Sequence, residues 1–366
     1  MVTLARETSG VRELVDRHLD DFLDREMERL DFLGEADLGV LRRYLVDFVT
    51  GSGKRLRPSF VYWGHRAAGG SEDDLDAVLS AGCAVELLHA CALILDDVMD
   101  EAGTRRGRIT AHAGLAGLHR ELGWSGPSWR FGESAATLLG MMAFTWADAA
   151  LLRCPLRLGA ALEVLTQLRV ELIGGQYLDL VSTARGSASR EQVTLISTYK
   201  SGKYTVERPL HLGHAIAGGD PALRRVLSAY ALPLGEAFQL RDDVLGVFGD
   251  PAVTGKPAGA DLLQGKQTYL TAVARERAGA YGMAPPGSGT LDAETPGEGP
   301  LGMGGGEAGL AAARELIVST GALDAVERRI ADLVAVATGA LDGAGIPADA
   351  AAALVELAGL ATGRSA

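Results

Sequence analysis

The chain has little cysteine, no excess of basic residues and no apolar leader at its start. Its 366 residues include three cysteines without a CxxC spacing, so neither a disulfide framework nor a zinc site is expected, and a reducing, cytoplasmic location is predicted. The net charge of -12 argues against a non-specific nucleic-acid binder. The first residues, MVTLARETSGVREL, lack the apolar core of a secretory signal.

Sheet-forming patterns are also scarce. Alternating Val, Ile and Thr are rare whereas Ala, Leu, Glu and Arg are common, which predicts an all-α protein. Residues 75–100 and 134–152 are apolar nearly all round and are expected in the middle of a large helical bundle. Because 134–152 is short and contains Asp148, no transmembrane segment is predicted. The other expected helices are 38–49, 156–180, 190–204, 222–245, 269–277, 309–338 and 347–362.

One segment does not follow the helical pattern. Residues 283–306 are rich in Gly and Pro and are interpreted as a mobile surface loop. A linker between two domains is the alternative, but the segment that follows is short for a second large core. We therefore expect a single domain over 1–366 with a short N-terminal extension. Pro209 should kink its helix and release the carbonyl of Thr205.

An acidic cluster ends the first apolar helix, in LILDDVMDEAGTRRG (93–107). Asp96 and Asp100 are one helical turn apart on one face, and His89 precedes them by two turns. Carboxylates this close repel one another unless a cation neutralises them, and oxygen ligands suit Mg²⁺. A solvated acidic helix end paired with Arg105 and Arg106 is the alternative.

A second acidic pair favours the metal interpretation. Asp242 and Asp243 lie in the mostly apolar FQLRDDVLGVFGD (238–250). Two such pairs facing each other across a bundle could hold several Mg²⁺ ions around one diphosphate.

Basic residues cluster beside glycines, although the chain is acidic. GSGKRLRP (51–58) resembles a P-loop superficially, but Arg55 follows Lys54 where Ser or Thr belongs. Two further lysine-bearing stretches contain Lys200 with Lys203 and Lys256 with Lys266. Any one of these lysines could be an ordinary surface residue, but together they suggest anion sites.

Six motifs, taken in their order along the chain, resemble those of the all-trans polyprenyl diphosphate synthases, in particular the geranylgeranyl diphosphate synthases. They are GKRLRP, ELLHACALILDDVMDEAGTRRG, GGQYLDL, YKSGKYT, FQLRDDVLGVFGD and GKPAGADLLQGKQT. The resemblance covers roughly residue 38 to the C-terminus. It implies a single large helical bundle of the isoprenoid synthase type with a central cavity, several Mg²⁺ ions and a homodimer.

The resemblance also implies a role for each matching position. The isopentenyl diphosphate ligands would be Lys54, Arg57, His89 and Arg106. Arg105 would bind the allylic diphosphate, and Asp96, Asp100 and Asp242 would bind metal, with Asp243 in support. The residues around the allylic diphosphate and the developing carbocation would be Lys200, Ser201, Gln239 and Lys256.

The implied reaction joins isopentenyl diphosphate to dimethylallyl, geranyl or farnesyl diphosphate by ionisation, condensation and elimination. Cys91 and Ala92 are small where large aromatic residues in the family block the growing tail, and Leu88 lies deeper. These residues predict a C20 product, geranylgeranyl diphosphate. Cys91 and Ala92 could equally be ordinary small core residues, and farnesyl or longer products are the alternatives.

Three positions depart from the family pattern. Gly246 replaces the usual third aspartate of the second motif, for which Asp250 is a candidate substitute. Leu95 replaces a common histidine, and Met141 a common aspartate. Two other classes of function are alternatives. A non-catalytic regulatory subunit would be expected to lose aspartate motifs that this chain keeps, and a class I terpene cyclase would not need Lys54, Arg57 and His89.

Overall fold

The computed structural model describes residues 8–51, 53–105, 107–186, 188–250, 259–263, 266–280, 301 and 307–363. Contacts divide the chain into two compact units, each built from three separate segments. Unit 1 comprises residues 1–166, 208–225 and 345–357, and unit 2 comprises residues 167–207, 226–344 and 358–366. Helices dominate both units, which confirms the all-α prediction.

Unit 1 begins with a helix where only an N-terminal extension was predicted. Its elements are α1 (Thr8–Glu28), η2 (Asp31–Leu33), α2 (Gly34–Leu41), η3 (Arg42–Val46), α3 (Asp47–Thr50), α4 (Leu56–Ala67), η4 (Glu72–Asp74), α5 (Leu75–Met99), β1 (Thr104–Arg105), β2 (Arg108–Ile109), α6 (Ala111–Glu121), α7 (Ser128–Leu151) and α10 (Arg208–Ala217). Helix α1 buries Val11, Leu19 and Phe22, so it belongs to the core.

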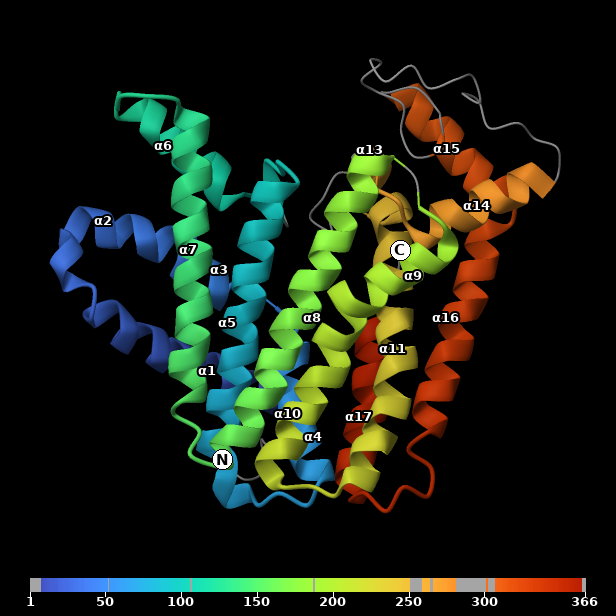
Figure 1. The fold of residues 1–366 in the computed structure, drawn as a ribbon, viewed down its shortest axis with the longest axis horizontal. Helices are drawn as coiled ribbons and strands as arrows, with labels where there is room; N and C mark the ends of the chain where they lie inside the picture. The colour runs from blue at the N-terminus through green and yellow to red at the C-terminus, as the bar shows by residue number, and fades with distance from the viewer. Residues whose placement is uncertain are drawn as a thin grey trace. The chain divides into compact units, whose positions relative to one another are not determined.

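Helix α5 runs beside α7 at the centre of unit 1 (Figure 1). Both are long and apolar enough to span a membrane, but 78% of the most apolar part of α5 is buried inside the protein. The predicted central position is therefore confirmed for α5. It is wrong for one face of α7, where only 44% of the corresponding part is buried and Leu138 and Met141 are exposed.

Unit 2 contains most of the remaining helices. Three helices are shared with unit 1: α8 (Leu158–Arg185), α11 (Pro221–Phe248) and α17 (Ala348–Thr362). The others are α9 (Arg190–Ser197), η5 (Thr198–Glu207), α13 (Ala260–Leu263), α14 (Tyr269–Ala280), α15 (Glu307–Ser319) and α16 (Ala322–Gly339). The apolar faces of α11, α13, α14, α15 and α16 form one core, which also includes Leu301.

Two predicted helical segments differ in detail from the structure. The single helix expected over 309–338 is broken between α15 and α16, where Gly321 adopts a φ of 67°. Pro209, where a kink was predicted, is the second residue of α10 and follows directly after the π-helix η5. The predicted loop at 283–306 lies outside the described residues except for Leu301, which is buried rather than on the surface.

Candidate active site

One face of helix α5 carries the first group of predicted ligands. With 3.6 residues per turn, residues spaced four and three apart stay within about 40° of one line along the helix. Gly82, Glu86, His89, Asp96 and Asp100 follow this spacing. The helix ends at Met99, so the two predicted metal ligands lie at its C-terminal end and His89 lies about two turns below Asp96.

The end of α5 is closed by a reversal that brings the chain back toward the aspartates. The amide of Ala102 donates to the carbonyl of Asp97 (2.9 Å) and that of Glu101 to the carbonyl of Val98 (3.3 Å). This is a Schellman motif in which Glu101, with φ 50°, takes the left-handed position usually held by glycine. The antiparallel pair β1–β2 follows directly.

Arg105 on β1 returns to the acidic helix end. Its Nε donates to Asp97 Oδ1 (2.7 Å) and its Nη2 to Asp96 Oδ2 (2.9 Å). Burial alone would lower the pKa of Arg105, but the charges of Asp97 and Asp96 outweigh burial and raise that pKa. The ion pair considered as an alternative is therefore present for Arg105, whereas Arg106 lies outside the described residues.

The basic loop lies against the same face of α5. Lys54 is exposed and Arg57 is half-buried at the start of α4. Pro58 packs so closely on α5 that a Cβ added to Gly82 would lie 3.2 Å from the Pro58 Cβ. His89 continues the face that contains Gly82, and Lys54 and Arg57 are the sequence neighbours of Arg55 and Pro58, which contact this face.

Unit 2 places Lys200 and Ser201 in the π-helix η5. The backbone of η5 comes so close to α8 that a Cβ on Gly175 would collide with the amide of Lys200. Gly202 meets Gly235 of α11 in the same way, since a Cβ on Gly235 would lie 2.5 Å from the Gly202 Cα. The Nζ of Lys200 forms an ion pair with Asp179 Oδ2 on α8 (2.6 Å).

The second acidic pair lies near the end of α11. Asp242 is partly exposed, whereas Asp243 is buried. Asp243 accepts hydrogen bonds from Gln239 Nε2 (2.9 Å) and from the amide of Tyr269 (3.2 Å). Burial raises the pKa of Asp243 to about 8; the bond from Gln239 opposes this rise and the charge of Asp261 adds to it. Asp243 therefore faces the core, and its supporting role beside Asp242 stays a prediction.

The missing third aspartate has a structural explanation. A Cβ on Gly246 would collide with the carboxylate of Asp261 on α13. The space next to Gly246 is thus already filled by an acidic side chain from another element. Asp250, which the sequence suggested as a substitute, is exposed beyond the end of α11. Lys256 lies outside the described residues.

Sequence reasoning gave no role to three residues that shape these clusters: Arg55, Asp179 and Asp261. Each lies inside a motif that was noted, GKRLRP, GGQYLDL and GKPAGADLLQGKQT respectively. A signal was present, because each is a charged residue beside assigned positions. The contacts that explain them join distant segments, so spacing along the chain could not reveal them.

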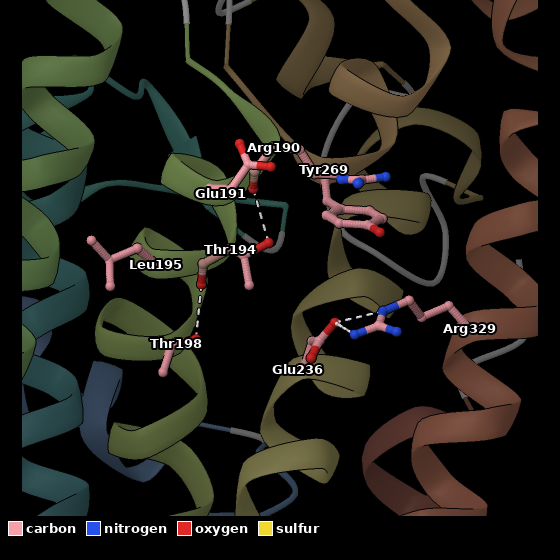
Figure 2. Close-up of a pocket in the computed structure, with 8 residues that line it drawn as sticks. All are labelled: Arg190, Glu191, Thr194, Leu195, Thr198, Glu236, Tyr269 and Arg329. Carbon is pink, nitrogen blue, oxygen red and sulfur yellow. Dashed lines mark hydrogen bonds and ion pairs between the residues drawn. The ribbon is translucent and has the colours of Figure 1, made fainter. Parts of the chain in front are cut away.

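A surface pocket of unit 2 adjoins the second cluster (Figure 2). It is lined in part by Thr198, the first residue of η5, and by Tyr269, whose amide donates to Asp243. Its two arginines form ion pairs with glutamates: Arg329 with Glu236 (2.7 Å) and Arg190 with Glu276 of α14 (3.5 Å). The described residues that line it include none of the predicted ligands.

The donor set at the end of α5 fits magnesium. Asp96 and Asp100 offer oxygen ligands one turn apart, and the Arg105 guanidinium already places a cation against Asp96. Within the part of the chain that the structure describes, no three acidic, histidine or cysteine side chains surround a common point. Mg²⁺ typically takes one or two carboxylates and completes its shell with water and substrate phosphate.

Comparison with known proteins agrees with this chemistry. Residues 39–281 match the polyprenyl synthetase family. The chain belongs to this family. It is therefore a prenyltransferase of the isoprenoid-synthase fold, a family that generally uses Mg²⁺.

Individual members of the polyprenyl synthetase family resemble the chain over most of its length. The geranylgeranyl diphosphate synthase of Methanosarcina mazei is 30% identical over 76% of this chain and 77% of its own. The geranylfarnesyl diphosphate synthase of Aeropyrum pernix is 29% identical over 86% and 88%. A crystal structure of a geranylgeranyl pyrophosphate synthase from Corynebacterium glutamicum, complexed with isoprenyl diphosphate and magnesium, has 37% identity, a TM-score of 0.89, and coverage of 97% of this chain and 99% of its own.

Proposed function

We propose that this prenyltransferase condenses isopentenyl diphosphate with an allylic diphosphate and that its main product is geranylgeranyl diphosphate. The observation that carries the proposal is the face of α5, which has the partly exposed Asp96 and Asp100 at its end and His89 two turns below, beside the basic loop. Two separate anion sites on one helix suit a two-substrate reaction. A terpene cyclase, with one diphosphate substrate, would not need the second.

In this proposal the basic groups bind one substrate and the acidic helix end binds the other. Lys54, Arg57 and His89 hold the diphosphate of isopentenyl diphosphate. Asp96, Asp100 and Asp242 hold several Mg²⁺ ions, and Arg105 and Lys200 add positive charge around the allylic diphosphate; Arg106 and Lys256 are proposed ligands from the sequence alone. When bound, Mg²⁺ supplies charge that stabilises the departing diphosphate. That both acidic pairs act on one diphosphate is part of the proposal.

The polar groups of unit 2 would stabilise the allylic cation. The amide NH₂ of Gln239 donates to Asp243 Oδ1, so the Gln239 Oε1 is not used in this bond. This oxygen and the hydroxyl of Ser201 can offer lone pairs to a cation. The double bond of isopentenyl diphosphate attacks the cation, and the departed diphosphate accepts the proton that is lost. Apolar surroundings exclude water that would quench the cation.

Product length would depend on the α5 residues beneath Asp96. Ala92 lies four residues before Asp96 and is about 40° away around the helix, whereas Cys91 is about 140° away. Ala92 is also partly exposed, while Cys91 and Leu88 are buried. The small side chain of Ala92 therefore supports an open path for a longer tail, with Leu88 one turn deeper as part of its floor.

Replacing Ala92 by a larger residue tests this assignment. Ala92→Phe should shift the main product from C20 to C15 or shorter, because the ring would fill space on the side of Asp96. Cys91→Phe is the matched control, and we expect it to reduce stability more than product length, since overpacking a buried site costs about 1–3 kcal/mol. Chromatography of the dephosphorylated prenyl alcohols gives the answer. An unchanged product from Ala92→Phe would contradict the proposed path.

The proposed function itself is tested by direct assay. Radiolabelled isopentenyl diphosphate is supplied with dimethylallyl, geranyl or farnesyl diphosphate and Mg²⁺, and the alcohol is identified after phosphatase treatment. A labelled C20 alcohol supports the proposal. Absence of incorporation would favour a regulatory subunit, a cyclic hydrocarbon from one substrate would favour a terpene cyclase, and a C15 or longer alcohol would correct the product.

We further propose that both units form a single synthase domain and that the protein is a homodimer. The chain passes repeatedly between the units, since each is assembled from three separate segments. The outward face of α7 carries Leu138 (64% exposed) and Met141 (59% exposed), and exposed apolar patches commonly mark interfaces. A molecular mass measured by light scattering at twice the chain mass of 38.2 kDa is the expected result, and a monomer would contradict it.

A further inference from the structure

The second basic residue of GKRLRP turns into the protein instead of toward a ligand. Arg55 is only 5% exposed, whereas its neighbour Lys54 is exposed. Its Nε donates to Asp16 Oδ1 on α1 (2.7 Å) and its Nη1 to Glu86 Oε1 on α5 (2.7 Å). Its Nη2 donates to the carbonyl of Gly51 (3.0 Å). One guanidinium therefore joins two helices and the beginning of its own loop.

The backbone at Arg55 is unusual in a way that these contacts explain. Arg55 has φ 48° and ψ 38° at the N-cap of α4, a left-handed conformation that non-glycine residues adopt rarely. Its carbonyl accepts from the amide (3.0 Å) and the hydroxyl (2.8 Å) of Ser59. With this backbone conformation the side chain of Arg55 is buried, whereas the side chain of the preceding Lys54 is exposed.

Glu86 connects this arrangement to the proposed ligands. It lies on α5 one turn before His89 and on the same face. The Arg55–Glu86 pair thus fixes the basic loop at a set height along the face of α5 that carries His89. Pro58, packed on Gly82 one turn below Glu86, provides the second point of attachment.

We propose that Arg55 is a positioning residue for the isopentenyl diphosphate site: its buried guanidinium sets Lys54 and Arg57 in register with His89 without touching the substrate. The inference rests on the proposed function, because it assigns those three residues to that diphosphate. A purely structural role would lower stability but leave the affinity of the folded enzyme for each substrate unchanged.

The test compares two substitutions at Arg55 in the full-length enzyme. Arg55→Asn tolerates the left-handed backbone but cannot reach both Asp16 and Glu86. We expect it to raise the KM for isopentenyl diphosphate by about tenfold or more, and the KM for the allylic substrate by less than about threefold. Arg55→Lys keeps the charge and can pair with one carboxylate, so it should recover part of the loss.

A matched control separates positioning from stability. Arg153 forms a comparable ion pair with the buried Glu26 (2.8 Å) between α1 and the segment after α7. Arg153→Gln should lower the unfolding temperature and leave both KM values unchanged. If Arg55→Asn does not fold, Asp16→Asn takes its place, because it removes one partner of Arg55 at a more exposed position. The same difference between the two KM values is expected.

The outcomes fall into four groups. An equal rise in both KM values, or none, in the folded variant would overturn the positioning role. A selective rise would support it. Lack of condensation by the wild-type enzyme would instead overturn the proposed function.

Discussion

The two acidic helix ends use the same pair of residue types in different surroundings. In each pair the first aspartate, Asp96 or Asp242, is partly exposed and the second, Asp97 or Asp243, is 3% exposed. Asp97 is paired with a cation, Arg105, at 2.7 Å. Asp243 has two neutral donors instead, the Gln239 amide and the Tyr269 backbone.

This difference shows that adjacent aspartates in one motif need not have one role. Successive residues on a helix point about 100° apart, so only one member of each pair can face a substrate while the other faces the core. A buried carboxylate is stable either as an ion beside a cation or with a raised pKa. At the end of α5, the cation Arg105 is paired with Asp97. At the end of α11, burial raises the pKa of Asp243 to about 8.

The largest expected effect separates the exposed aspartates from the buried ones. Asp96→Asn and Asp242→Asn should each lower kcat by about 10²–10³-fold, the usual cost of losing one group that stabilises developing charge. The unfolding temperature of Asp242→Asn should stay close to that of the wild type, because Asp242 is partly exposed. Asp96→Asn should also lower the unfolding temperature, because Arg105 loses one of its two carboxylate partners. Steady-state kinetics and thermal unfolding on the same samples measure both. Activity that survives either substitution would show that the corresponding carboxylate is not a metal ligand.

An intermediate effect compares the two buried aspartates. Asp97→Asn should destabilise the protein by about 3 kcal/mol, because it takes one partner from a buried arginine that still retains Asp96. Asp243→Asn should cost less, about 1–2 kcal/mol, since Asn keeps one acceptor for the two neutral donors. Urea unfolding of both variants gives the two values. The reverse order would show that charge pairing is not what distinguishes the two ends.

The smallest effect concerns the glycine that replaces the third aspartate of the second end. Gly246→Ala should push the Asp261 carboxylate aside at a cost of about 1 kcal/mol or less, because the side chain can rotate. Activity should fall by about three- to tenfold if Asp261 acts with Asp242 on the metal. The control is Gly279→Ala in α14, where an added Cβ meets nothing within 4 Å. Equal activity of both variants would remove Asp261 from the site.

The fold class and the shared face of the α5 residues could be predicted from the sequence because both depend on local pattern. The roles of the site residues come from the family resemblance and stay predictions. The 3.6-residue period gave the central position of α5 and the shared face of His89, Asp96 and Asp100. The exposed face of α7 was not predicted, because the sequence pattern of an apolar helix is the same whether the helix packs on its own chain or on another molecule. The core helix α1 was also missed, as was the break at Gly321.

The sequence by itself determined which chemical groups the protein can offer: paired carboxylates at helix ends, basic residues beside glycines, and small residues below Asp96. Only the tertiary structure decided which member of each pair is buried and what neutralises it. The partners of Arg55, Asp97, Asp243 and Gly246 come from elements up to 39 residues away, as in the Arg55–Asp16 pair. Electrostatic energies depend on distance and burial in space, and neither is encoded in the spacing of residues along a chain.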